Sequence, residues 1–323
     1  MSARSGRPDW EATMRVSAGG TTVAVLDGDG HTPDEVERHL AETGAVVVRS
    51  TGFTDIPGFH ERVERFSAPL IGSYRGGNTP RTPVGGAVFT STEYPARYPI
   101  SLHNELSYAG TWPDRLYFGC LVAARTGGAT PLCDGRALLE HLPDPVRERF
   151  TSRGVTYHQN LHSGHGLGRS WQDTFETADR GEVEEFLAGA GAEHSWTRSG
   201  GLRVTHRRPA TREHARGHEV WFNQADQWHP SNLPGEGAAD LLDLVDDPAD
   251  LPHWVTYGDG APIPGSDLDA VRAAADRNRV VVPWRPGDLV VVDNMAVLHG
   301  REAYTGPRRV VVAMGRAGHS TAV

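Results

Sequence analysis

The chain has 323 residues, of which 38% are hydrophobic and 23% charged, a composition typical of a globular protein with a substantial core. All 32 basic residues are arginine, so no lysine is present to form a Schiff base, anchor pyridoxal phosphate or complete a phosphate-binding P-loop. The formal net charge of −9 argues against nucleic acid as a partner, because phosphate backbones are bound by clustered positive charge.

Cysteine usage and the absence of apolar runs indicate the compartment. Cys120 and Cys133 lie thirteen residues apart, which fits neither a C-x-x-C redox motif nor a zinc ribbon. We therefore expect two buried thiols in a reducing cytoplasm. The first 16 residues contain no apolar signal segment and no run approaches the length of a membrane span, so we expect neither export nor membrane insertion.

The first predicted element is a helix that begins at Thr32 and ends at Gly44. Thr32-Pro33-Asp34-Glu35 combines an N-cap, a proline at the first helical position and a capping-box glutamate. A strand follows at Ala45–Arg49, and a second amphipathic helix is predicted over Gly58–Phe66.

Short β-branched segments dominate the rest of the chain. Strands are expected at Leu116–Ala123, at Glu219–Asn223, at Val280–Trp284, at Leu289–Asp293, at Arg308–Met314 and on both sides of Ser199-Gly200-Gly201. Helices are expected at Ala137–His141, Val146–Phe150, Glu182–Leu187 and Leu268–Asp276, and Tyr157–Gly168 is expected to be a loop. Because strands and helices do not alternate regularly, the sequence predicts a mainly β fold with added helices, a double-stranded β-helix (jelly roll), in a single domain over residues 1–323.

A candidate metal site lies in Ser101-Leu102-His103-Asn104-Glu105. In an extended segment, H-x-E places the imidazole and the carboxylate on one face, so both can bind one metal. His299, expected at the end of a strand, would complete a set of two histidines and one carboxylate. Such a set leaves coordination positions open on Fe(II) for a cosubstrate and O₂. A surface histidine beside an unrelated glutamate would be the simpler interpretation of H-x-E alone.

An arginine near His299 strengthens the metal interpretation. Tyr304-Thr305-Gly306-Pro307 has the composition of a turn, so we expect the strand containing Arg309 to fold back beside His299. A guanidinium there would bind the distal carboxylate of 2-oxoglutarate through two hydrogen bonds. The hydroxyl of Thr130 could donate to the same carboxylate.

These segments together resemble the TauD/TfdA superfamily of Fe(II)/2-oxoglutarate dioxygenases, and more closely its SyrP-like and clavaminate synthase-like branch. The resemblance spans most of the chain, from Gly44–Arg49 through His103-Asn104-Glu105, Gly127-Gly128-Ala129-Thr130, Glu219–Gln224 and Trp284–Asp288 to His299-Gly300-Arg301 and Arg308-Arg309. It implies that His103, Glu105 and His299 bind iron. It also implies that Thr130 and a C-terminal arginine hold 2-oxoglutarate.

Two departures from the family pattern refine these expectations. Taurine dioxygenase resembles this chain but has an aspartate in its H-x-D motif and a further arginine where this sequence has Ala313. Glu105 matches the amino-acid-hydroxylating branch and argues against halogenation, for which the carboxylate is replaced. We expect Arg309 to anchor the cosubstrate, with Arg308 as the alternative.

The resemblance implies hydroxylation of an unactivated C–H bond in an amino acid or amino-acid-derived intermediate of secondary metabolism, free or tethered to a carrier protein. Desaturation or cyclisation at the same iron centre is one alternative, a zinc-dependent hydrolase using the same triad is another, and a non-catalytic binding module is a third. Arg75 and Arg81 precede the H-x-E motif and could bind a substrate carboxylate. The candidate substrate contacts are Arg75, Asn104, Tyr108, Asn160 and Asn223.

Overall fold

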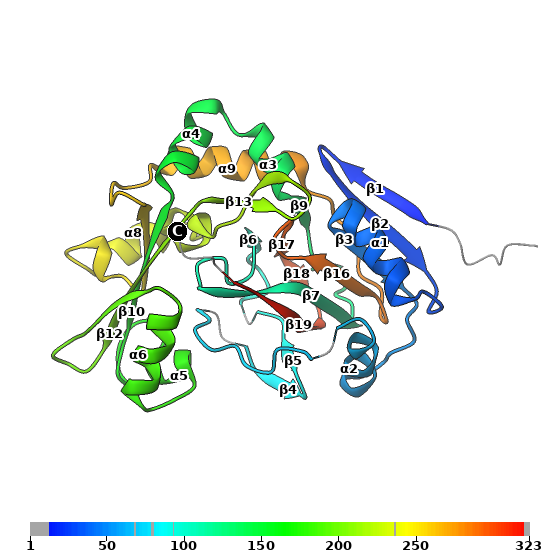
Figure 1. Ribbon diagram of the computed structural model, residues 1–323, viewed down its shortest axis with the longest axis horizontal. Coiled ribbons are helices and arrows are strands. Elements are labelled where there is room, and N and C mark those ends of the chain that lie inside the picture. Colours follow the sequence, from blue (N-terminus) through cyan, green and yellow to red (C-terminus); the bar gives the residue numbers. More distant parts are fainter. Residues whose placement is uncertain (1–12, 68, 79–80, 93, 236, 320–323) are drawn as a thin grey trace, which may run out of the picture.

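A computed structural model describes residues 13–67, 69–78, 81–92, 94–235 and 237–319, and an eight-stranded sheet with the order β1-β2-β3-β16-β7-β19-β5-β4 runs through it (Figure 1). Its strands are β1 Met14–Ala18, β2 Thr21–Asp27, β3 Ala45–Arg49, β4 Pro83–Gly85, β5 Val88–Thr90, β7 Thr111–Val122, β16 Leu289–Asp293 and β19 Arg309–His319. β2 and β3 pair in parallel, and the other pairs are antiparallel.

Smaller sheets lie beside this main sheet. A three-stranded sheet, β6-β17-β9, contains β6 Ile100–His103, β9 Leu132–Asp134 and β17 Val297–Arg301. A four-stranded sheet, β11-β12-β10-β15, contains β10 Val155–Leu161, β11 Glu193–Trp196, β12 Leu202–Arg208 and β15 His253–Tyr257. Two short pairs complete the strands: β8 Thr126–Gly127 with β18 Tyr304–Thr305, and β13 Thr211–His214 with β14 His218–Trp221.

Helices cover the sheets. They are α1 Pro33–Thr43, α2 Ile56–Glu64, α3 Gly135–His141, α4 Asp144–Arg153, α5 Trp171–Phe175, α6 Arg180–Gly189, α7 Ala225–Trp228, α8 Gly237–Leu242 and α9 Gly265–Asn278, with short 3₁₀ turns at Pro230–Asn232 and Pro248–Asp250. Figure 1 shows α5 and α6 beside β10 and β12, at the opposite end of the molecule from β1 and β2.

Both faces of the main sheet are buried, which explains its near-continuous apolar strands. In β16, Leu289 and Val291 belong to the apolar cluster that includes residues of α1 and α2. Val290 and Val292 alternate with them and belong to the larger cluster that includes residues of α3 and α9. The mainly β fold with added helices is therefore confirmed.

Several local predictions are confirmed by the backbone. The Thr32 side chain accepts a hydrogen bond from the Glu35 amide, and Gly44 ends α1 with φ 73°, a conformation that glycine adopts without steric cost. The predicted strands at Ala45–Arg49 and Leu289–Asp293 have the observed bounds. The second helix begins at Ile56, earlier than predicted, because Asp55 caps it. Cys120 and Cys133 are both buried and unpaired.

Three local predictions are wrong. Val280–Trp284 is not a strand: Val280 forms a single bridge with Leu132, and Pro283 cannot donate a ladder hydrogen bond. The expected loop at Tyr157–Gly168 begins inside strand β10, which is held between β12 and β15. The predicted pairing of the His299 and Arg309 strands also fails, because β17 pairs with β6 and β9 while β19 pairs with β7 and β5.

The described helices also bear on membrane insertion. Within the described ranges, every helix is too short or too polar to span a lipid bilayer.

Candidate functional site

Three side chains converge where β6 and β17 pair. His103 is the last residue of β6 and lies opposite His299 of β17 in the antiparallel register. The Nε2 atoms of His103 and His299 lie 3.8 Å and 3.7 Å from Oε2 of Glu105. One ligand atom from each of these three buried residues falls within 4.8 Å of the others. Two imidazole nitrogens and one carboxylate oxygen at this spacing fit a divalent metal such as Fe(II).

Glu105 is not in an extended segment, as the sequence analysis assumed, but in the turn that follows β6. The turn is held by Asn294, whose Oδ1 accepts from the Glu105 amide at 2.8 Å and whose Nδ2 donates to the Glu105 carbonyl at 2.9 Å. Asn104 donates its own side-chain amide to the Asn294 carbonyl at 2.7 Å. Leu106 adopts a φ of 55°, a left-handed conformation that is uncommon for a residue with a side chain.

The Glu105 carboxylate has two further partners. The Tyr74 hydroxyl donates to Oε1, and Nη2 of Arg81 donates to Oε2 at 2.5 Å. Burial alone would raise the pKa of Glu105, but Arg81 and the hydrogen bonds of the two histidines lower it well below its ordinary value. Glu105 is therefore ionised, and Oε2 is the oxygen that faces both histidines.

Both histidines are held so that their Nε2 atoms face Glu105. Nδ1 of His103 lies 2.9 Å from the Ser101 carbonyl and 2.9 Å from Nε2 of Gln227, which directs its Nε2 toward Glu105. Burial and the neighbouring His103 lower the pKa of His299 to about 4, so its imidazole is neutral at physiological pH and free to act as a ligand.

A small cavity beside the triad contains the candidate cosubstrate residues. Thr130, Arg308, His103 and His299 all line it. Nε of Arg308 donates to the Gly128 carbonyl at 2.8 Å, and Nη1 lies 3.4 Å from the Ser91 hydroxyl. Burial and the nearby Arg301 lower the pKa of Arg308 to about 10, and among the described residues no carboxylate forms an ion pair with it. The cavity thus presents a desolvated cation to an anionic ligand.

The first choice for this role, Arg309, is not placed to fill it. Arg309 is an exposed residue at the start of β19, and it does not line the cavity. Arg308, which immediately precedes β19, lines the cavity instead and donates to the Gly128 carbonyl. The structure therefore favours Arg308, the alternative.

The candidate substrate contacts are scattered. The Arg75 Nη2 donates to the Glu182 carbonyl, and its guanidinium lies over the Phe186 ring, against α6. Asn104 is buried against Asn294, and the Tyr108 hydroxyl bonds the backbone of Gly76 and Asn78. Asn160 donates to the carbonyls of Ala249 and Leu251. Of the five residues, Asn223 alone lines the large cavity described next.

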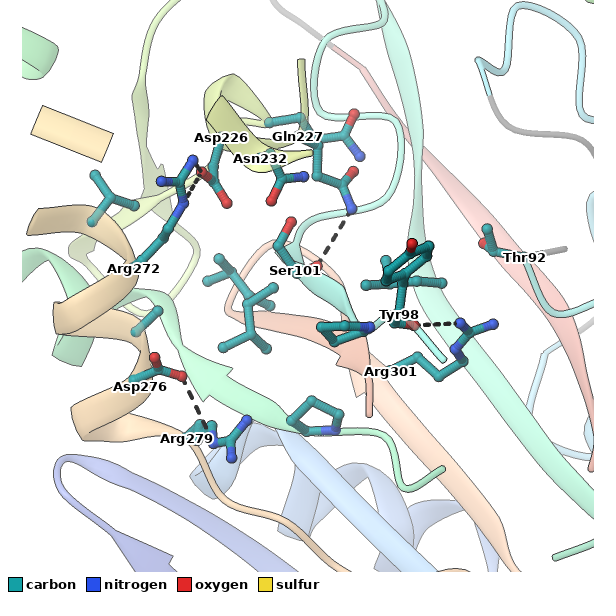
Figure 2. Close-up of a pocket in the computed structure, with 18 of the residues that line it drawn as sticks. Thr92, Tyr98, Ser101, Asp226, Gln227, Asn232, Arg272, Asp276, Arg279 and Arg301 are labelled. Carbon is teal, nitrogen blue, oxygen red and sulfur yellow. Dashed lines mark hydrogen bonds and ion pairs between the residues drawn. The ribbon is translucent and has the colours of Figure 1, made fainter. Parts of the chain in front are cut away.

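The large cavity, of about 630 Å³, lies between α7, α9 and the outer face of β6 and β17. Figure 2 shows Asp226 and Arg272 on one side and Tyr98 and Arg301 on the other. Gln227, which contacts His103, lines it, and its wall shares Thr92, Ile100 and Arg301 with the small cavity. The two cavities are therefore adjacent.

Sequence reasoning missed the residues that hold the triad. Tyr74 lies 31 positions before Glu105, Gln227 lies 124 positions after His103, and Asn294 lies 189 positions after Glu105. None of them belongs to a local motif. The position of Asn294, five residues before His299, is the one signal that could have indicated a role near the metal site.

Comparisons with known proteins agree with this geometry. The family "Taurine catabolism dioxygenase TauD, TfdA family" matches residues 4–314. Dapdiamide synthesis protein DdaC of Enterobacter agglomerans is 33% identical over 285 residues, which cover 88% of this chain and 84% of that protein. Clavaminate synthase-like protein At3g21360 of Arabidopsis thaliana is 31% identical over 284 residues, which cover 85% of this chain and 82% of that protein.

Solved structures show the same fold. PvcB of Pseudomonas aeruginosa superposes with a TM-score of 0.53 at 14% identity, covering 97% of this chain and 94% of that chain. AAD-2, solved with Mn(II) and N-oxalylglycine, superposes with a TM-score of 0.54 at 16% identity, covering 95% of this chain and 98% of that chain. With the family match and the metal and cosubstrate geometry taken together, the chain belongs to the TauD/TfdA family and is a dioxygenase that uses Fe(II), 2-oxoglutarate and O₂.

Proposed function

We propose that this enzyme hydroxylates an unactivated C–H bond of an amino acid or amino-acid-derived intermediate of secondary metabolism, presented free or on a carrier protein. The observation that carries the proposal is the small cavity in which His103 and His299 of the triad meet Thr130 and Arg308. Support for the pathway comes from a relative named for dapdiamide synthesis and from PvcB, described as an oxygenase of an isonitrile synthetic pathway.

In this proposal, each residue of the site has one task. His103, Glu105 and His299 hold the iron, which together with 2-oxoglutarate and O₂ supplies the oxidising chemistry. Arg308 binds the distal carboxylate of 2-oxoglutarate, and Thr130 donates a hydrogen bond to it. Nε1 of Trp284 donates to the Thr130 hydroxyl oxygen at 3.2 Å, which leaves the hydroxyl proton available for donation.

Tyr74 has a positioning task. Its hydroxyl donates to Oε1 of Glu105, while Oε2, which also accepts from Arg81, is the oxygen that faces both histidines. A carboxylate held in this way would offer Oε2 to a metal bound between the two histidines. The fit of the donor set to iron therefore depends on a side chain outside the triad.

The same observations support the finer architecture. We infer a single catalytic domain, since the family match spans residues 4–314. We also infer that the main sheet and the β6-β17-β9 sheet form the two walls of a double-stranded β-helix, with the metal between them.

The function is tested by anaerobic addition of Fe(II) and 2-oxoglutarate, followed by succinate release with a panel of free amino acids and their carrier-bound thioesters. A visible charge-transfer band is expected only when 2-oxoglutarate chelates iron at the triad. Hydroxylation adds one oxygen atom to the product, whereas desaturation or cyclisation removes two hydrogen atoms, so product mass separates these alternatives. A zinc hydrolase would give neither the band nor succinate, and it leaves Arg308 and Thr130 without a task.

A further inference from the structure

Arg81 is a buried cation whose hydrogen-bonding capacity is only partly used. Its side chain is 3% exposed, and its Nη2 donates to Glu105. Among the described residues, Nε and Nη1 of Arg81 have no hydrogen-bond partner, although both atoms are buried. A buried donor without a partner is unfavourable, so such a group in a native protein calls for an explanation, and a bound anion is one.

The position of Arg81 is fixed from two sides. Its Cζ lies 5.0 Å from the centroid of the Tyr74 ring, a cation–π contact, and its Nη2 is 2.5 Å from Oε2 of Glu105. A guanidinium has five N–H donors along a rigid fork. Nη2 shares one edge of the guanidinium with Nε and the other edge with Nη1. Glu105 uses one N–H of Nη2, so the edge that Glu105 does not use keeps two N–H donors for a second carboxylate.

Arg81 also lies between the metal site and solvent. It lines the small cavity with His103, His299 and Arg308, and it also lines an open polar cleft of about 530 Å³ that Arg169 and Asp173 border. A molecule that enters from this cleft therefore meets Arg81 before it reaches the triad.

The local charge favours an anion at this point. Arg81, Arg301 and Arg308 line the small cavity, no carboxylate of the described residues lines it, and Glu105 contacts Arg81 from beside it. The charges of a divalent metal and a dianionic cosubstrate cancel, so binding them leaves this excess of positive charge unchanged. Arg301 donates to the backbone carbonyls of Tyr94, Pro95 and Tyr98 through both of its Nη atoms, which leaves its Nε unpartnered among the described residues, whereas Arg81 has both Nε and Nη1 unpartnered there.

We propose that Arg81 binds a free carboxylate of the substrate and holds it beside the metal site. This inference rests on the proposed function and narrows it: the substrate carries an unesterified carboxylate when it binds. If the substrate is tethered through a thioester, that carboxylate belongs to another part of the molecule. Arg75, six residues earlier, does not share the role, because it is engaged with Glu182 and Phe186.

The test uses probes that differ only in charge. The full-length protein is loaded with Mn(II) and N-oxalylglycine, an oxygen-stable analogue of 2-oxoglutarate, and the methyl proton relaxation of added acetate and of acetamide is measured by NMR. Because Mn(II) accelerates the relaxation of nearby protons, we expect a several-fold greater enhancement for acetate than for its neutral isostere. Equal enhancement of the two probes would overturn the proposal.

Two variants locate the acetate site. Arg81→Gln is expected to abolish the acetate preference, whereas Arg75→Gln, the matched control from the same segment, is expected to retain it. A preference that persists in Arg81→Gln would refute the role of Arg81. If Arg81→Gln does not take up Mn(II), bromide soaked into crystals of the loaded wild-type protein gives the second measurement. An anomalous peak against Nε or Nη1 of Arg81 supports the site, and its absence overturns it.

The two proposals fail in different ways. Failure of Mn(II) and N-oxalylglycine to bind at the triad contradicts the proposed function and removes the basis of the inference. Normal loading without an acetate preference contradicts the inference alone.

Discussion

The side-chain amide of Asn294 accepts from the backbone N–H of Glu105 at 2.8 Å and donates to the backbone carbonyl of Glu105 at 2.9 Å, across 189 residues of sequence. Asn294 Nδ2 also donates to the Pro113 carbonyl at 2.8 Å. All of these groups are buried. The carboxylate that faces the two histidines is therefore placed by a residue that precedes β17, and the two halves of the triad are joined by an amide as well as by strand pairing.

Asn294→Ala is expected to lower both stability and metal affinity. The substitution leaves three buried backbone groups without partners, which should reduce the free energy of unfolding by about 2–4 kcal/mol. Urea unfolding of the metal-free protein checks the stability, and Mn(II) titration checks the affinity. Asn160→Ala removes two side-chain hydrogen bonds far from Glu105, so it should change stability without changing Mn(II) affinity. Equal Mn(II) affinity in both variants would contradict the role of Asn294.

Arg308→Gln is expected to weaken 2-oxoglutarate binding selectively. Loss of one partner from a buried charged pair costs about 2–5 kcal/mol, equivalent to roughly a 30-fold to several-thousand-fold rise in Kd. Titration of the anaerobic charge-transfer band measures this Kd. Arg309→Gln is the control, because its side chain is on an exposed residue of β19, and its Kd should match that of the wild type. A raised Kd in Arg309→Gln together with an unchanged Kd in Arg308→Gln would instead assign 2-oxoglutarate binding to Arg309.

His299→Gln is expected to lower Mn(II) or Fe(II) affinity by more than about 100-fold, since loss of an outer-shell partner of a metal ligand already costs 10–100-fold. Calorimetric titration of the metal-free protein gives the affinity without relying on turnover. His218→Gln serves as the control: His218 pairs with His214 across the β13–β14 hairpin and is not part of the triad cluster. An unchanged affinity in His299→Gln would contradict the triad.

His206 predicts loss of stability in acid. Burial and the charge of Arg208 lower the pKa of His206 to about 3. In the unfolded chain His206 takes up a proton near pH 6.5, whereas in the folded chain it does so only near pH 3. The free energy of unfolding is therefore highest above pH 6.5 and decreases as the pH falls toward 3. The expected contribution between pH 7 and pH 5 is about 2 kcal/mol. Urea unfolding at both pH values should show a smaller difference for His206→Gln than for the wild type. Equal differences would contradict this assignment.

The sequence predicted correctly those helices and strands whose ends are set by residues adjacent in the chain. The Thr32 cap and Gly44 define α1, and the apolar runs at Ala45–Arg49 and Leu289–Asp293 define two central strands. Val280–Trp284 has the same β-branched composition. It fails to form a strand because it makes one bridge, to Leu132, before Pro283 interrupts the ladder. Whether a segment has a neighbouring strand to pair with cannot be predicted from its composition alone.

The same distinction holds for the site. H-x-E and the distal histidine could be found because their types and order are characteristic of the chemistry, and the three side chains do converge. The choice between Arg308 and Arg309 depends on which of two adjacent side chains lines the small cavity, and no local pattern encodes that. Tyr74 and Asn294 reach Glu105 through the tertiary fold, so the support of the carboxylate could not be predicted from spacing.

The direct pairing of His103 with His299 has a consequence for how the chain assembles. Side chains alternate between the two faces of a strand, so a shift of β17 by one residue would place Leu298 or Gly300 opposite His103 and turn the second imidazole away. A misaligned sheet thus has at most two of the three ligands and little affinity for iron. Metal binding would therefore stabilise the correctly aligned conformer over the misaligned one by mass action.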